Sequence, residues 1–329
     1  MSNKSLPIVL VSHELPDGWI EPLEKRCELI IGPPEGDYLV ERLEARLPDA
    51  EGLFSLLTIK IDDTLISKAP NLRVVSNMAV GFDNIDIEAC SKRGIPVGNT
   101  PGVLTDGTAD LTMAILLAAA RRLFEAQQDA RQGRWTTWSP TGWLGKDLSG
   151  AKLGIVGLGK IGTAVARRAR GFGMEIIYSD PHHNLELAEE IGAQRVDFQE
   201  LLQVADFVSL HVPLTEQTRH LINEDALQLM KSSALLVNTS RGPIVDQDAL
   251  IQALKNGLIG GAALDVTDPE PLPPDNELYN LKNCLIVPHI GSATWNTRRR
   301  MAERACENLL AGLEGRQLPY CVNPEVYQR

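Results

Sequence analysis

Several features that would mark other classes of protein are missing from this sequence of 329 residues. No apolar run approaches the ~20 residues that a membrane-spanning helix needs. We also expect no signal peptide, because Met1–Ser5 leads directly into a strand-like run. Basic residues are few: 32 Lys and Arg stand against 43 Asp and Glu, and the formal charge of −11 argues against a nucleic-acid partner. These absences disfavour proteins that bind membranes or nucleic acids.

The five cysteines do not have the spacing of a metal site, because no two of them form a CxxC motif. An odd, scattered set in a chain of this size predicts reduced thiols in the cytoplasm. We therefore expect a cytoplasmic protein without a metal centre. The apolar content of 43% is ordinary for a globular protein, and the chain is long enough for two domains with their own cores.

Strand-like apolar runs alternate with helical patterns along the whole chain. The predicted strands are Ile8–Val11, Leu53–Leu57, Val74–Asn77, Leu153–Gly157, Glu175–Tyr178, Phe207–His211, Ala234–Asn238, Gly261–Val266 and Leu285–Val287. Two helices are predicted over Thr108–Gln132 and Thr294–Gly312. This alternation predicts an α/β fold with parallel sheets.

The segment Leu153–Gly162 has the pattern of a dinucleotide-binding turn, with a buried strand, then G-x-G-x-x-G, then a helix. Gly157 permits the tight turn, Gly159 lets the backbone approach a pyrophosphate, and Gly162 lets helix and strand pack closely. The free N–H groups and the dipole of the helix N-terminus favour that anion. The next strand run ends at Asp180, which would bind the adenosine ribose and repel a 2′-phosphate. The cofactor predicted is therefore NAD, with NADP left as the alternative by His182 and His183.

The glycine motif begins so far along the chain that a unit of domain size must precede it. We predict two Rossmann-like, doubly wound domains. A smaller, flavodoxin-like substrate domain comprises residues 1–102 plus 296–329, and a larger NAD-binding domain comprises residues 103–295.

An enzyme that uses a nicotinamide cofactor on an alcohol needs an acid/base and an anchor for its substrate. Of the six histidines, His289 and His211 follow strands, and ligands of open α/β sheets bind at the carboxyl ends of strands. His289 is favoured as the acid/base. His211 remains its rival and is also a candidate for the cofactor wall.

Arg241 and Glu270 are the other two catalytic candidates. Arg241 follows a hydrophobic strand, and its planar guanidinium suits a carboxylate; the alternative is a solvated loop arginine. Glu270 lies among the prolines of Asp268–Pro274, where the alternative is a solvated acid.

Together, four motifs in order resemble those of the D-isomer-specific 2-hydroxyacid dehydrogenases over nearly the whole chain. They are Gly157–Gly162, Asn238–Gly242, Ala263–Val266 with Pro269–Leu272, and Pro288–Ser292. The resemblance implies that Arg241 anchors the carboxylate, that His289 is the acid/base and that Glu270 orients it. It also implies that Asp265 holds the nicotinamide carboxamide. The backbone N–H groups of Val80 and Gly81 would bind the substrate carboxylate.

Further candidates complete the predicted site. Contacts with the cofactor are expected from Thr108, Lys160, Ile161, Pro213, Thr218 and Thr239. Contacts with the substrate are expected from Leu57, Trp138 and Ser292.

Within the family, the sequence is most similar to glyoxylate/hydroxypyruvate reductases, through Gly52–Leu57, Thr100–Asp106 and Gly133–Trp138. Glu270 argues against a formate dehydrogenase, where the resemblance implies glutamine. The expected function is NADH-dependent reduction of small 2-oxoacids to D-2-hydroxyacids: glyoxylate to glycolate and hydroxypyruvate to D-glycerate. One alternative is a phosphite dehydrogenase of the same fold. Another is a dinucleotide-sensing protein that resembles corepressors.

Three of the five tryptophans lie in the segment Arg131–Leu148, at positions 135, 138 and 143. They could pack on their own subunit. Aromatic anchors dominate the cores of interfaces, however, and the resemblance implies a dimerising arm at this position. We therefore predict a homodimer in which Trp138 reaches the neighbouring substrate pocket.

Overall fold

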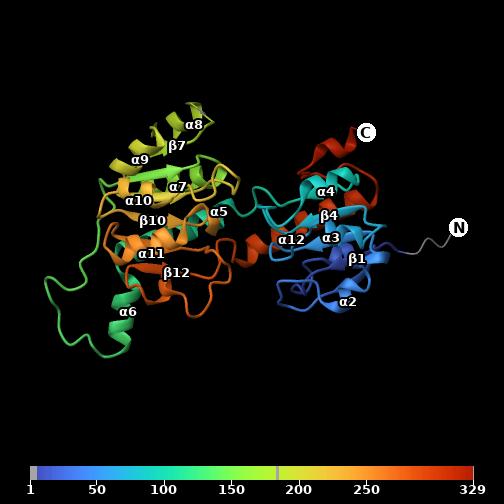
Figure 1. Cartoon of the computed structure of the whole chain (residues 1–329), viewed down its shortest axis with the longest axis horizontal. Coiled ribbons are helices and arrows are strands. Elements are labelled where there is room, and N and C mark those ends of the chain that lie inside the picture. The colour runs from blue at the N-terminus through green and yellow to red at the C-terminus, as the bar shows by residue number, and fades with distance from the viewer. Residues whose placement is uncertain (1–5, 183–184, 329) are drawn as a thin grey trace. The chain divides into compact units, whose positions relative to one another are not determined.

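The computed structural model describes residues 6–182 and 185–328, and the chain forms two compact units (Figure 1). The first unit comprises Met1–Leu104 and Thr294–Arg329, and the second comprises Thr105–Ala293. Among the described residues, no helix combines the length and apolar character needed to cross a membrane.

The first unit is built around a five-stranded parallel sheet in the order β2-β1-β3-β4-β5. Its strands are β1 (Ile8–Val11), β2 (Glu28–Ile31), β3 (Gly52–Ser55), β4 (Val74–Asn77) and β5 (Val97–Gly98). Its helices are α1 (Glu21–Glu24), α2 (Glu41–Glu44), α3 (Asp63–Ser67), α4 (Ile87–Lys92) and α12 (Trp295–Leu313), with 3-10 turns η1 (Leu47–Asp49) and η4 (Pro324–Tyr327). The central strands β3 and β4 are wholly buried, as is usual for parallel strands covered on both faces.

The second unit is built around a seven-stranded parallel sheet in the order β12-β11-β10-β9-β6-β7-β8. Its strands are β6 (Lys152–Val156), β7 (Glu175–Ser179), β8 (Ala193–Arg195), β9 (Phe207–Leu210), β10 (Leu235–Asn238), β11 (Gly261–Leu264) and β12 (Cys284–Ile286). Its helices are α5 (Thr105–Ala120), α6 (Leu123–Arg131), α7 (Lys160–Gly171), α8 (Leu185–Glu190), α9 (Phe198–Val204), α10 (Glu224–Leu229) and α11 (Gln247–Lys255), with η2 (Gly242–Ile244) and η3 (Glu277–Asn280). The strand order reverses between β6 and β9, which makes this the topological switch point where open α/β sheets bind ligands.

The predicted α/β fold with parallel sheets is confirmed. The nine predicted strands are present, with ends that differ by at most two residues, but β2, β5 and β8 were not predicted. β5 contains two residues, and β8 is a largely exposed edge strand of sequence AQR. Neither carries the apolar run on which strand prediction depends.

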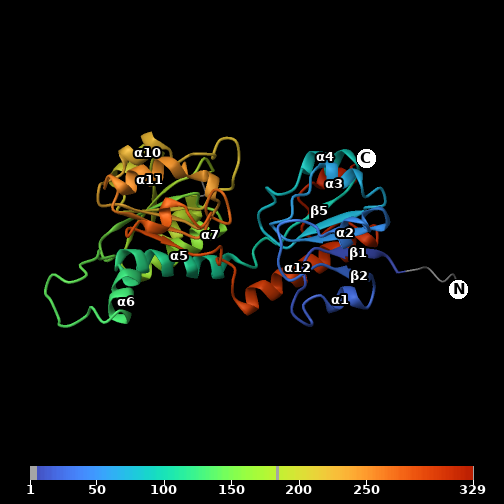
Figure 2. The same cartoon turned by 60° about the horizontal axis from the view of Figure 1, so that its bottom comes forward.

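The prediction of one helix over Thr108–Gln132 is wrong, because two helices, α5 and α6, occupy this region (Figure 2). The chain turns at Arg122, which has a left-handed backbone conformation with φ of 50°. The carbonyl of Ala120 accepts a hydrogen bond from the Lys146 N–H at 2.8 Å. A contact with a residue far along the chain therefore replaces a bond that would have continued the helix.

Candidate active site

Six strands of the second unit end at one edge of its sheet, since all of them run parallel. The predicted residues that directly follow five of these strands are Gly157, Asp180, His211, Thr239 and Asp265, and His289 follows the sixth, β12, three residues on. The edge therefore carries most of the predicted cofactor and catalytic side chains of this unit.

The glycine motif packs as its residue types require. Gly157 has φ of 93°, and a Cβ there would lie 2.8 Å from the His211 carbonyl oxygen. A Cβ on Gly162 would lie 2.2 Å from the Gly157 carbonyl oxygen, so only glycine allows helix α7 to approach the turn this closely. At Gly159, by contrast, a Cβ would meet nothing within 4 Å. The backbone there is open to a ligand.

Helix α7 begins at this open position. Its N-cap is Gly159, which offers no side-chain cap, and its first turn contains no acidic residue. The first N–H groups of an α-helix have no partner within the helix, and together with the helix dipole they favour an anion. The N-terminus, which includes Lys160 and Ile161, therefore fits the pyrophosphate of a dinucleotide.

Asp180 follows β7 beside the glycine turn. One of its carboxylate oxygens accepts the Leu158 N–H at 2.7 Å, and the other accepts the His182 N–H at 2.7 Å. Arg195 donates to the Asp180 backbone carbonyl at 3.0 Å. The carboxylate is thus held in place next to the predicted pyrophosphate site, while His183 lies outside the described residues.

His211 follows β9, and its Nε2 lies 2.8 Å from the Ser209 Oγ. Burial lowers the pKa of this imidazole to about 4. His211 is therefore neutral near pH 7 and is not an imidazolium that could act as a proton donor. The cofactor-wall role remains compatible with its position.

Three other predicted cofactor contacts of this unit, Thr108 on helix α5 and Thr218 and Thr239 after strands, take part in hydrogen bonds. Thr239 is buried, and its Oγ1 lies 2.9 Å from the Thr112 Oγ1 on helix α5. Thr112 in turn donates to the Thr108 carbonyl at 2.8 Å. Thr218 donates to the Pro213 carbonyl at 2.6 Å, which closes the loop after β9.

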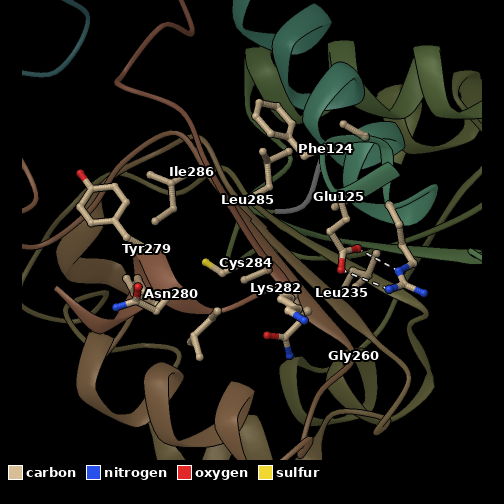
Figure 3. A pocket seen from close by; sticks show the side chains of 18 of the residues that line it. Phe124, Glu125, Leu235, Gly260, Tyr279, Asn280, Lys282, Cys284, Leu285 and Ile286 are labelled. Atoms are coloured by element: carbon tan, nitrogen blue, oxygen red, sulfur yellow. Dashed lines mark hydrogen bonds and ion pairs between the residues drawn. The ribbon is translucent and has the colours of Figure 1, made fainter. Parts of the chain in front are cut away.

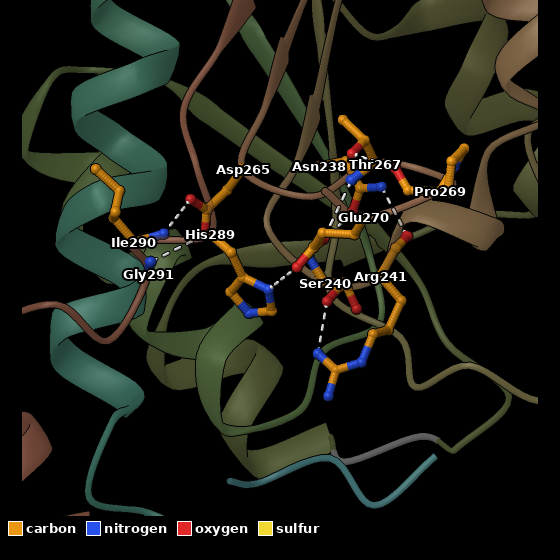
Figure 4. A network of polar contacts seen from close by, with 10 residues as sticks. All are labelled: Asn238, Ser240, Arg241, Asp265, Thr267, Pro269, Glu270, His289, Ile290 and Gly291. Atoms are coloured by element: carbon orange, nitrogen blue, oxygen red, sulfur yellow. Dashed lines mark hydrogen bonds and ion pairs between the residues drawn. The ribbon is translucent and has the colours of Figure 1, made fainter. Parts of the chain in front are cut away.

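His289 and Glu270 form the central contact of the edge. Figure 4 shows the His289 ring directed at the Glu270 carboxylate, and its Nδ1 hydrogen-bonds that carboxylate. The second oxygen of Glu270 accepts the Thr267 N–H at 3.3 Å. Glu270 thereby fixes the ring orientation through the Nδ1 atom of His289, and the Nε2 atom lies on the other side of the ring.

Asp265 holds the backbone on which His289 is placed. Its two carboxylate oxygens accept the N–H groups of Ile290 at 2.6 Å and Gly291 at 2.9 Å (Figure 4). The His289 N–H donates to the Asp265 carbonyl at 2.9 Å, and His289 has a left-handed φ of 50°. Burial raises the pKa of the Asp265 carboxyl, and the two backbone N–H groups oppose that rise. These contacts occupy both oxygens of the residue that was expected to hold the carboxamide.

Arg241 follows β10 and begins η2. The Asn238 side chain donates to the Arg241 carbonyl at 2.8 Å, and the Arg241 guanidinium donates to the Ser240 carbonyl at 2.8 Å. The half-buried Ser292 lies three residues beyond His289, after the turn that Asp265 holds.

The remaining substrate candidates belong to other segments of the chain. Val80 and Gly81 are half-buried in the loop after β4 of the first unit, and Leu57 is 36% exposed after β3. Trp138 lies in the segment after α6 in the second unit and is 79% exposed. Each was singled out by resemblance, and each role stays a prediction.

Sequence reasoning missed several partners of these residues. Ser209 lies two residues before His211, so both side chains extend from the same face of the strand, and this spacing could have revealed the pair. Thr112 lies one helical turn after Thr108, which places the two on one face of α5. Its bond to Thr239, 127 residues away, has no signal in the sequence.

Known proteins resemble this chain over most of its length. Residues 113–291 match the family model described as "D-isomer specific 2-hydroxyacid dehydrogenase, NAD binding domain". The chain is 49% identical to the glyoxylate reductase of Korarchaeum cryptofilum over 325 residues, which covers 97% of each chain. It is 49% identical to the glyoxylate reductase of Thermococcus litoralis over 329 residues, which covers 97% of this chain and 98% of the relative. Among solved structures, the TT0316 protein of Thermus thermophilus has a TM-score of 0.90 at 46% identity and covers 96% of this chain and 99% of its own.

Proposed function

The chain belongs to the D-isomer-specific 2-hydroxyacid dehydrogenases, which are oxidoreductases that use a nicotinamide dinucleotide, and we propose that it reduces glyoxylate to glycolate and hydroxypyruvate to D-glycerate with NADH. The observation that carries this proposal is the hydrogen-bonded pair of His289 and Glu270 at the carboxyl edge of the dinucleotide-binding sheet. The names of the relatives favour glyoxylate over phosphite and over a purely regulatory role.

The bound nicotinamide supplies the hydride for the 2-oxo carbon of the substrate. As negative charge develops on the substrate oxygen, protonated His289 donates its Nε2 proton to it. Glu270, on the other side of the ring, accepts the hydrogen bond of Nδ1 and keeps the ring in position for this transfer. Arg241 binds the substrate carboxylate and offsets charge on the reacting oxygen. The first unit is proposed as the substrate domain and the second as the NAD-binding domain.

The preference for NADH rests on Asp180. Its carboxylate is fixed by two backbone N–H groups next to the N-terminus of α7. A carboxylate at this point accepts hydrogen bonds from ribose hydroxyls and repels the 2′-phosphate of NADPH.

The proposal includes a homodimer formed through the second unit. Trp135 and Trp138 are 72% and 79% exposed in the single chain, which is unusual for large aromatic side chains. The same unit has a cavity of about 760 Å³ beside the edge strand β12 (Figure 3). Its lining includes Phe124, Tyr279, Leu285 and Ile286. Two copies related by a two-fold axis could bury both features at once.

The test is reduction of glyoxylate by NADH, followed by the loss of nicotinamide absorbance. His289→Ala removes the proton donor and should lower kcat by ~10²–10⁴-fold while leaving NADH affinity nearly intact. His220→Asn is the matched control, because His220 is exposed and its left-handed φ of 52° suits asparagine. Chiral analysis of the glycerate made from hydroxypyruvate should show the D-isomer. Normal turnover by the His289 variant would contradict the assignment.

A further inference from the structure

The loop after β4 in the first unit contains three consecutive peptide groups whose carbonyl oxygens are all anchored. The Ala79 carbonyl accepts the Thr100 N–H at 2.9 Å. The Val80 carbonyl accepts from the Asn99 side-chain amide at 2.8 Å, and the Gly81 carbonyl accepts from the Asn77 side-chain amide at 3.0 Å. Because a trans peptide is planar, its N–H points away from its C=O. The next N–H groups along the chain, those of residues 80, 81 and 82, therefore point away from the anchors.

Over the described part of the chain, none of these three N–H groups has an acceptor. Val80 and Gly81 are half-buried, and an N–H without a partner in such a place is unfavourable. Successive backbone N–H groups without partners of their own can form a concave site for an anion. A hydrogen bond to each carbonyl also polarises its peptide and strengthens the N–H as a donor.

The side-chain oxygen of Asn77 and both of its amide hydrogens take part in hydrogen bonds. It is fully buried, its oxygen accepts from the Ser55 hydroxyl at 3.1 Å, and its second amide hydrogen goes to the Asn84 oxygen at 3.1 Å. Asn84 in turn donates to the Ile59 carbonyl at 2.9 Å. Rotation of the Asn77 amide would break three hydrogen bonds, so the Gly81 carbonyl has one fixed donor.

We infer that Asn77 and Asn99 are positioning residues that fix this loop so that the N–H groups of Val80, Gly81 and Phe82 bind the carboxylate of the substrate. The inference rests on the proposed function. It adds the two asparagine anchors and a third donor, the Phe82 N–H, to the two donors expected from the sequence. Neither asparagine contacts the substrate; each acts through the peptide whose carbonyl it holds.

The decisive variant is Asn99→Asp, which keeps the size of the side chain but places a carboxylate oxygen against the Val80 carbonyl. The peptide that carries the Gly81 N–H must then turn away from its position. We expect KM for glyoxylate to rise ~10–100-fold, as for the loss of a hydrogen bond to a charged group, with kcat within about threefold of the wild type. The NADH dissociation constant should not change.

Asn323→Asp is the matched control. Asn323 is a buried asparagine of the first unit and, like the half-buried Asn99, donates to a carbonyl, that of Ile95, at 3.0 Å, but it makes no hydrogen bond with residues 79–82. Its substitution should lower the melting temperature and leave KM unchanged. If the role of Asn99 were purely structural, both variants would lower the melting temperature and leave KM for glyoxylate unchanged.

Calorimetric titration with oxamate, a carboxylate that resembles a 2-oxoacid but accepts no hydride, separates this inference from the proposed function. In the presence of NADH, Asn99→Asp should raise the dissociation constant of oxamate by the same factor as it raises KM for glyoxylate. In ¹H–¹⁵N spectra of the wild type, the amide signals of residues 80–82 should shift when oxamate binds. A wild type that binds oxamate but does not reduce glyoxylate would overturn the function and leave the anchors supported.

Unchanged oxamate affinity in Asn99→Asp, or no oxamate binding by the wild type, would contradict the positioning role inferred for the two asparagines. If the aspartate variant does not fold, Asn99→Ala, which frees the Val80 carbonyl without repelling it, takes its place in the same titration with the same two outcomes.

Discussion

The burial of His211 makes the stability of the protein depend on pH with a sign and size that can be worked out. Burial lowers the pKa of the imidazole from 6.5 to about 4 in the folded state. Because the unfolded chain binds this proton more tightly, the contribution of His211 to stability is fully present above pH 6.5. It is lost as pH falls from 6.5 towards 4. The loss should reach about 2 kcal/mol at pH 5 relative to pH 8.

The matching perturbation is His211→Gln, which removes the titration and can keep a hydrogen bond to Ser209. Unfolding by urea would be measured for both proteins at pH 8, 6.5 and 5. Between pH 8 and pH 5 the wild type should lose about 2 kcal/mol more than the variant, or ~4–8 °C more in melting temperature for a unit of this size. His220→Gln, at an exposed position, controls for the loss of a histidine as such.

Stability profiles that run parallel for the wild type and His211→Gln would refute this reasoning. They would mean that the ring titrates alike in the folded and unfolded states. His211 would then return as a candidate for the proton donor, in competition with His289.

Three further outcomes are expected. Arg241→Lys keeps the charge but loses the planar fork, so KM should rise and kcat should fall together, and wild-type values for both would exclude Arg241 as the carboxylate anchor. For cofactor choice, kcat/KM should be higher with NADH than with NADPH, and Asp180→Ala should reduce this preference. A preference for NADPH would indicate instead that His182 or Arg195 binds the 2′-phosphate. Light scattering should give twice the chain mass of 36.0 kDa, since a stable two-fold interface buries more than about 1,000 Å², and a monomer at working concentration would rule out the dimer. If the dimer holds, Trp138→Ala should alter the preference between small and larger 2-oxoacids.

The positions of the catalytic candidates could be predicted because they depend on a local pattern. Arg241 and His289 each follow an apolar run, and in a parallel sheet such ends lie at one edge. The glycine motif could also be predicted, because Gly157 and Gly162 each meet a steric demand of the turn or of the helix packed on it, while Gly159 leaves the backbone open.

What could not be predicted depends on partners far apart in the sequence. The break between α5 and α6 follows from a left-handed Arg122 and a bond from Lys146 to Ala120. The loop anchors Asn77 and Asn99 are short polar residues near strand ends, a common pattern with no functional mark of its own. Their role depends on the carbonyl groups to which their side chains donate, and only the folded structure determines these partners.

The backbone of His289 places stability and activity in opposition at one position. A left-handed conformation is unfavourable for a residue with a Cβ by roughly 1–2 kcal/mol, and glycine or asparagine would adopt it more readily. Selection for heat resistance alone would therefore favour replacing this histidine, whereas the proposed role in proton transfer would favour keeping it. The bonds from Asp265 to the next two residues hold the turn in the less stable form. With His289 as the proposed proton donor, a more thermostable enzyme would have to find its gains at other positions, because the gain available here would abolish the proposed proton transfer.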